Sequence, residues 1–219
     1  MEKQVMRKGL QVKYDITYGS KGTVVLLGGV RKHHLKGHLS DFFIRQDHTV
    51  IVPSLLVSDI AANLPQLSVQ LQAVLDNEDI KVPVIIGLRE GCSIAMAYSL
   101  EVPVKKLFLI DPVGRDFNRI DTLRALAVRM RLLFIRLLLW QSAHRAASLL
   151  FLECMDYERN ILSINPPIIL VEHEDIFTAH RGIKELQKLN PKLKVSYTTG
   201  NRLVTRRPYE IITRLMAYW

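Results

Sequence analysis

The sequence predicts an α/β fold whose sheet is mostly parallel and doubly wound, with helices on both faces. Short apolar runs rich in β-branched residues, which are typical of buried strands, recur at 23–27, 49–52, 82–86, 106–110, 168–171 and 193–197. Apolar residues at helical spacing follow several of these runs, at 35–43, 67–75, 92–99 and 179–189. Strands that alternate with helices favour parallel pairing, because each helix carries the chain back across a face of the sheet.

The two ends of the chain extend this pattern. Residues 10–18 alternate apolar and polar side chains, as a half-buried antiparallel strand does. Residues 209–219 have helical spacing, and Pro208 stands near the first turn, where its missing N–H leaves no helical bond unmade. Since 219 residues suit one hydrophobic core, we expect a single domain over residues 1–219.

The composition is that of a folded, basic protein. Apolar residues make up 48% of the chain and charged residues 23%, and the formal net charge is +9. A basic balance favours anionic partners, but no nucleic-acid-binding motif accompanies it, so no nucleic-acid partner is expected. Two cysteines, Cys92 and Cys154, fit a reducing compartment. The sequence shows neither a signal-peptide pattern nor a long apolar run, and we expect a cytoplasmic protein without a spanning helix.

The most informative stretch joins the strand expected at 82–86 to the helix expected at 92–99. Gly87 and Gly91 bracket three larger residues, and the helix that follows consists mainly of small and apolar side chains. A strand, a tight Gly-x-x-x-Gly turn and a closely packed helix form the nucleophile elbow of α/β-hydrolases. This part of the chain resembles that superfamily.

Other stretches carry the same resemblance in the same order. Gly28-Gly29-Val30 follows a strand where the family has His-Gly, Asp111-Pro112 follows the strand at 106–110, and 200–208 is similar to the family's Gly-His and Arg-Pro pattern. The resemblance implies an α/β-hydrolase-like fold over nearly the whole chain. It also implies a short helical cap inserted at 115–160, within the same domain.

The resemblance places unusual residues at the three catalytic positions. Arg89 stands at the nucleophile position and Asn201 at the base position. A strict count puts Ile176 at the acid position and a one-residue slip puts Asp175 there; we assign Asp175. A guanidinium stays protonated and an amide accepts no proton near neutrality, so neither Arg89 nor Asn201 supplies the usual chemistry. We therefore predict a catalytically inactive hydrolase-fold protein that binds a ligand or a partner.

The alternative is an active ester or thioester hydrolase, or an acyltransferase, that uses a non-standard serine or cysteine. Ser93 and Cys92 are the fallback nucleophiles. Ser93 comes four residues after Arg89, about one helical turn beyond the elbow. Cys92 stands where the family commonly has glycine, and a buried cysteine usually acts as a small hydrophobic residue.

An anion site is expected where the nucleophile is missing. The resemblance implies that the backbone amides of Val30 and Glu90 still face the oxyanion position, so Gly29, Val30, Arg89 and Glu90 are the predicted binding residues for a small anionic or acyl ligand. A cation beside a helix N-terminus needs an anion close by. That anion is either internal, from Asp175 or Glu90, or an external carboxylate or phosphate.

The predicted cap has its own alternatives. Residues 123–152 contain no Gly or Pro and read as one or two helices, and 132–140 is very apolar with flanking arginines. We expect a lid over the pocket or a contact with a protein partner or a second copy. Peripheral contact with an anionic membrane is the other interpretation.

Histidine spacing suggests no metal centre. His34 and His38 are four residues apart on an expected helix, which brings them to one face. A structural or catalytic zinc site needs at least three protein ligands, and no third ligand lies near in sequence. We predict no metal and no cofactor.

Overall fold

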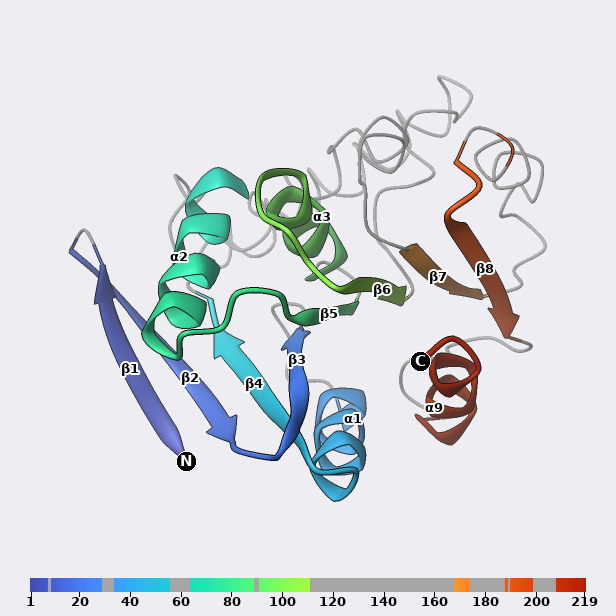
Figure 1. Cartoon of the computed structure of the whole chain (residues 1–219), viewed down its shortest axis with the longest axis horizontal. Coiled ribbons are helices and arrows are strands. Elements are labelled where there is room, and N and C mark those ends of the chain that lie inside the picture. Colours follow the sequence, from blue (N-terminus) through green and yellow to red (C-terminus); the bar gives the residue numbers. More distant parts are fainter. Residues whose placement is uncertain are drawn as a thin grey trace, which may run out of the picture.

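The computed structural model describes residues 1–7, 9–28, 34–55, 64–88, 91–110, 168–173, 188, 190–198 and 208–219 (Figure 1). Its strands are β1 (Glu2–Arg7), β2 (Leu10–Thr17), β3 (Lys21–Leu27), β4 (His48–Ser54), β5 (Val84–Leu88), β6 (Lys106–Ile110), β7 (Ile168–His173) and β8 (Leu193–Thr198). Its helices are α1 (His34–Arg45), α2 (Leu64–Asn77), α3 (Gly91–Glu101) and α9 (Pro208–Met216). The predicted cap at 115–160 and nearly all of the helix predicted at 179–189 lie outside these residues.

The strands form one sheet in the order β1-β2-β4-β3-β5-β6-β7-β8. The strands from β4 to β8 in this order pair in parallel, whereas β1–β2 and β2–β4 are antiparallel. The predicted mostly parallel α/β fold is therefore confirmed. Within the described residues, no helix has the length and apolar composition needed to cross a bilayer.

The largest differences from the expectation concern the first and fifth strands. The sequence prediction missed β1, whose residues are mostly polar or charged because it lies at the sheet edge and pairs only with β2. The fifth strand begins at Val84 and ends at Leu88, two residues later than predicted. Pro83 has no N–H to give to a strand ladder, although its carbonyl accepts a hydrogen bond from the Lys105 N–H at 2.9 Å.

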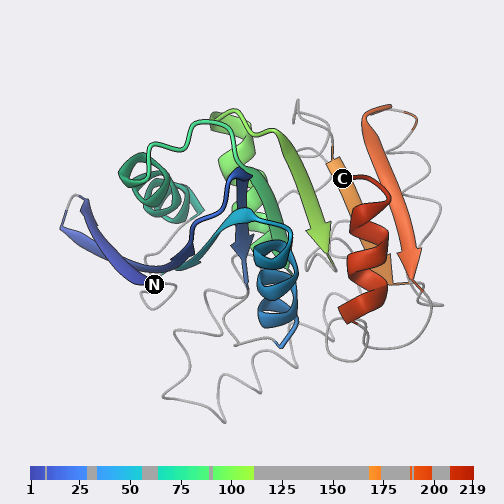
Figure 2. The same cartoon turned by 60° about the horizontal axis from the view of Figure 1, so that its bottom comes forward.

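Alternating side chains of the central strands supply two cores. On β3, Val25 and Leu27 pack in the core that α2 and α3 cover, while Val24 and Leu26 face the other core. Helices α1 and α9 cover that second face, and Figure 2 brings both of them forward. Because both faces are covered, the inner strands read as continuous apolar runs, which is why the sequence located them.

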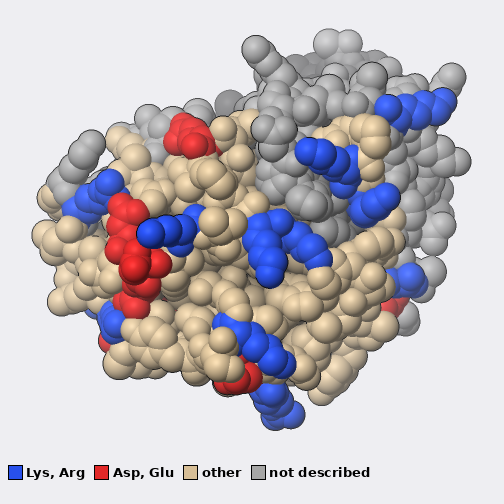
Figure 3. Space-filling model, viewed as in Figure 1, with Lys and Arg blue, Asp and Glu red and all other residues tan. Residues whose placement is uncertain are grey.

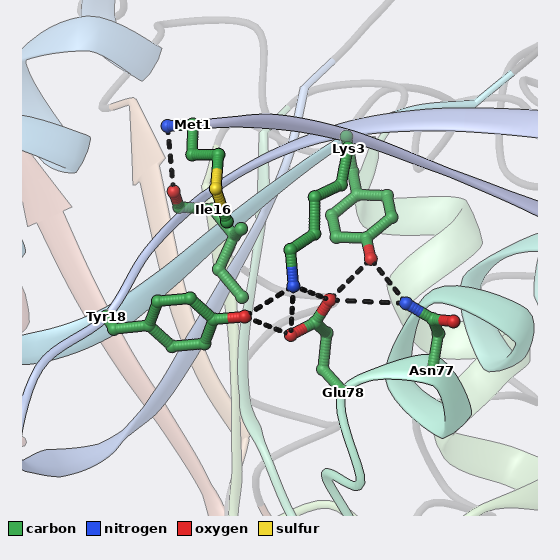
Figure 4. A network of polar contacts seen from close by, with 7 residues as sticks. Met1, Lys3, Ile16, Tyr18, Asn77 and Glu78 are labelled. Atoms are coloured by element: carbon green, nitrogen blue, oxygen red, sulfur yellow. Dashed lines mark hydrogen bonds and ion pairs between the residues drawn. The ribbon is translucent and has the colours of Figure 1, made fainter.

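Acidic side chains gather at the left of the face in Figure 3. Glu78, the residue that follows α2, anchors the antiparallel strands. The side chain of Glu78 is 5% exposed, and its carboxylate accepts hydrogen bonds from Tyr14 at 2.5 Å, Tyr18 at 2.6 Å and Lys3 at 2.9 Å (Figure 4). The Asn77 amide donates to the Tyr14 hydroxyl at 2.8 Å. This network joins β1 and β2 to the end of α2.

The network fixes the ionisation of Glu78. Burial on its own raises the pKa of this carboxyl, but the hydrogen bonds from Tyr14, Tyr18 and Lys3 outweigh burial and lower the pKa to about 2. Burial and, second to it, the hydrogen bond to Glu78 raise the pKa of the Tyr14 hydroxyl to about 12. The carboxylate therefore stabilises the fold only while it is ionised.

Replacing this carboxylate should remove an acid-sensitive part of the stability. A folded-state pKa of about 2 lies below the ordinary value of 4.5, so the contribution is present at neutral pH and disappears as pH falls from 4.5 towards 2. We expect Glu78→Gln to lower the free energy of unfolding at pH 7 by about 3 kcal/mol. Urea unfolding at several pH values measures this.

The matched control is Asp76→Asn, which breaks the exposed ion pair with Arg7 instead. An exposed pair contributes less than about 1 kcal/mol, so this variant should stay close to wild type. Wild type and Glu78→Gln should converge near the acid end of the series. A constant gap at every pH would contradict the assigned role of Glu78.

Candidate functional site

The carboxyl ends of six parallel strands share one edge of the sheet, and the order in which the chain adds strands reverses between β3 and β5. From β3 the chain passes through α1 to β4 on one side, and from β5 it passes through α3 to β6 on the other. In open α/β sheets such a switch point leaves a crevice where ligands bind. A ligand site is therefore expected at this edge.

At the switch point, α3 begins in direct contact with β3 and β5. A Cβ on Gly87 would lie 2.7 Å from the Cys92 Cα, and a Cβ on Gly91 would collide with the backbone carbonyl of Leu27. Real Cβ atoms essentially never come that close to backbone, so only glycine fits at either position. The two glycines of the predicted Gly-x-x-x-Gly turn therefore allow α3, β3 and β5 to approach one another closely.

The structure describes the edges of the predicted site but not its central residues. Arg89 and Glu90 fall between the last residue of β5 and the first residue of α3, and they lie outside the described residues. The other predicted site residues that also lie outside them are Gly29, Val30, Asp175 and Asn201. They follow the ends of β3, β7 and β8 by two or three residues. These assignments stay predictions.

Cys92 is described, and its thiol is part of the packing. The residue is 0% exposed, and its Sγ–H donates to the Gly87 carbonyl at 3.2 Å, with the Ile110 carbonyl at 3.5 Å. Gly87 is the second-to-last residue of β5, and Ile110 is the last residue of β6. The thiol therefore holds the first turn of α3 to two strands, which the sequence alone did not reveal.

Ser93 is also covered. It is the third residue of α3 and is 1% exposed. The first part of the helix is enclosed, since the neighbours Ile94, Ala95 and Met96 are buried as well. A nucleophile must reach a substrate carbonyl and a base at the same time, and a side chain in this position meets protein on all sides.

Of the two histidines that the sequence places on one helix face, the structure describes the side chain of His38. His38 lies on α1 beside Tyr209 of α9, with ring centroids 6.3 Å apart. Within the segments that the structure describes, no group of three or more His, Cys, Asp or Glu side chains gathers to hold a metal ion.

Comparison with known proteins gives one kind of match. No protein-family model matches the chain, and no curated protein matches its sequence. Among solved structures, an α/β hydrolase from a lagoon-sediment metagenome matches with a TM-score of 0.71 and 14% identity, covering 100% of this chain and 97% of that one. This chain has the α/β-hydrolase fold.

Two further structures with the α/β-hydrolase fold match over the same extent. One comes from a study of carboxylesterases of the thaumarchaeon Nitrososphaera gargenis, with a TM-score of 0.77 and 13% identity, covering 99% of this chain and 97% of that one. The other is the thioesterase domain of the curacin biosynthetic pathway, at 0.71 and 12%, covering 99% of each chain. The TM-scores establish the fold of this chain. Sequence identities this low say nothing about its activity, which has to be argued from the site.

The close approach at the elbow predicts a large stability loss on adding one methyl group. Gly91→Ala forces the new Cβ into the Leu27 carbonyl, so we expect the free energy of unfolding to fall by about 3 kcal/mol. Gly37→Ala is the matched control, because a Cβ at this exposed helical position meets nothing within 4 Å. That change should stabilise the protein by about 0.5–1 kcal/mol.

Urea unfolding of both variants checks this expectation. Wild-type stability in Gly91→Ala would mean that α3 does not begin against β3.

Proposed function

We propose that this chain binds a small acyl or anionic molecule at the carboxyl edge of its sheet and does not hydrolyse it through Ser93 or Cys92. The observation that carries the proposal is the packing of the elbow. Gly87 and Gly91 occupy the two positions where only glycine fits, and these are the positions that flank a nucleophile in α/β-hydrolases. The residue midway between them is Arg89, which has no nucleophilic atom at neutral pH.

The described residues near the elbow supply no substitute for the missing serine. The Cys92 thiol is directed at two backbone carbonyls, and Ser93 is enclosed in the first turn of α3. Neither side chain is available to a substrate at the switch point. This burial supports a binding role over hydrolysis by either fallback nucleophile.

The expected ligand follows from the charges at this edge. A helix N-terminus carries unpaired N–H groups and a partial positive charge, and α3 presents such an end beside β3 and β5. The Arg89 guanidinium would add a full charge and two parallel donors for a carboxylate or phosphate. Gly29, Val30 and Glu90 would supply backbone N–H groups, as the resemblance implies. An acyl chain would then extend under the predicted cap at 115–160.

Thermal unfolding with added anions tests the binding role. Phosphate and a short fatty carboxylate should each raise the melting temperature of the wild-type protein, because a ligand that binds only the folded state stabilises it. Arg89→Ala should remove this response, while Arg214→Ala, which removes an exposed charge on α9, should keep it. No anion response in the wild type, or the same response in both variants, would contradict the proposal.

The stability of Arg89→Ala without anions distinguishes the internal alternative. If Arg89 pairs with Asp175, its removal leaves a carboxylate unpaired and should lower the melting temperature even without added anion. If the site is kept for an external anion, the variant should melt close to wild type until an anion is added.

A second candidate function is hydrolysis of an ester or thioester. The comparisons support this alternative better than they support inactivity. One matching structure comes from a study of carboxylesterases, and another is a thioesterase domain. On the proposal above, purified protein should not hydrolyse p-nitrophenyl butyrate or an acyl thioester above the uncatalysed rate. Turnover that survives repurification and disappears in Ser93→Ala or Cys92→Ala would establish the hydrolase instead.

A further inference from the structure

Basic loops lie at the amino edge of the sheet, opposite the candidate site. The loops that lead into β5, β6 and β8 each combine proline with exposed lysine. Their sequences are Lys81-Val82-Pro83, Pro103-Val104-Lys105 and Pro191-Lys192. The first two cross the front of the molecule in Figure 1, below and beside α3.

The pairing of the strands brings these loops together. The Lys105 N–H donates to the Pro83 carbonyl at 2.9 Å, so the first two loops are bonded side by side. Leu107 of β6 pairs with Ile168 of β7, and Ile168 pairs with Leu193 of β8. The third loop therefore starts at the same level, two strands away, which is about 10 Å.

Exposed apolar side chains lie among these lysines. Val82 is 54% exposed in the first loop, and Leu100 is 40% exposed in the last turn of α3, which leads into the second loop. Lys81, Lys105 and Lys192 are all exposed. We call Lys81, Val82, Leu100, Lys105 and Lys192 the amino-edge surface.

Acidic residues only partly offset the charge here. Asp79 precedes the first loop and Glu101 precedes the second. In Figure 3 the basic side chains extend across the middle and right of this face, whereas most acidic ones gather at its left. The three lysines of the amino-edge surface outnumber these two carboxylates, and Val82 and Leu100 add exposed apolar side chains to it.

We propose that the amino-edge surface binds an anionic lipid bilayer. Lysines attract anionic headgroups over a Debye length, and each contributes to binding at close range. Val82 and Leu100 have no use against a sugar–phosphate backbone, but aliphatic side chains enter the boundary between headgroups and acyl chains. The three loops offer no aromatic ring for stacking on bases, which disfavours single-stranded nucleic acid. On the bilayer, the carboxyl edge would face away from the lipid.

Co-sedimentation of the full chain with vesicles tests this proposal. Wild-type protein should sediment with vesicles of phosphatidylcholine plus phosphatidylserine and stay in solution with phosphatidylcholine alone. Lys81→Glu/Lys105→Glu should weaken the partition into anionic vesicles by at least about tenfold. Lys13→Glu/Arg214→Glu changes the net charge equally, on exposed positions of β2 and α9, and should bind within about twofold of wild type.

The apolar contribution has its own variant. Val82→Ser/Leu100→Ser keeps every charge and should also weaken the partition, because less apolar area enters the interface. Circular dichroism of each variant confirms that it is folded.

Three outcomes would overturn the proposal. One is a wild-type protein that does not sediment with anionic vesicles. Another is an equal loss of vesicle binding in both charge variants, which would reflect net charge alone. The third is binding that the serine variant leaves unchanged and that a single-stranded DNA oligonucleotide abolishes, which would indicate a general polyanion surface.

Discussion

The close approach of α3 to β3 and β5 is the contact on which the site depends. Two glycines make it feasible, because the positions of Gly87 and Gly91 leave no room for a Cβ against the backbone of Cys92 and Leu27. The Cys92 thiol reinforces the contact by bonding to the ends of two strands. Only Arg89 and Glu90 separate the end of β5 from the start of α3.

The packing of the elbow is typical of an α/β-hydrolase, whereas the residue midway between its two glycines is unable to act as a nucleophile. An elbow of this geometry lifts one side chain above the sheet, and in α/β-hydrolases that side chain is the nucleophile. Here the sequence supplies Arg89, while the serine and cysteine that follow are enclosed by protein. The fold of these hydrolases is retained, and on the proposed function Arg89 takes the place of their nucleophile. Anion binding is then the chemistry proposed for this edge of the sheet.

Local patterns predicted most of the inner sheet, since buried parallel strands are continuous apolar runs bounded by turn residues. The first strand was missed because its stability comes from distant partners, such as the bond between Lys3 and Glu78, 75 residues away. At the site, the glycine spacing was visible in the sequence, but the carbonyl of Leu27 that requires Gly91 belongs to another strand. The bonds of the Cys92 thiol were hidden for the same reason, because Ile110 is 18 residues further on.

The most direct test of this account measures which thiols at the elbow are accessible. Arg89→Cys is made together with Cys154→Ser, so that only Cys92 and the introduced thiol remain. If position 89 faces the proposed site, its thiol should react rapidly with a disulfide reagent, because a site open to ligands admits the reagent and a helix N-terminus lowers the pKa of a nearby thiol. Cys92 should react only after unfolding. Protection at position 89 together with rapid labelling of Cys92 would contradict the account.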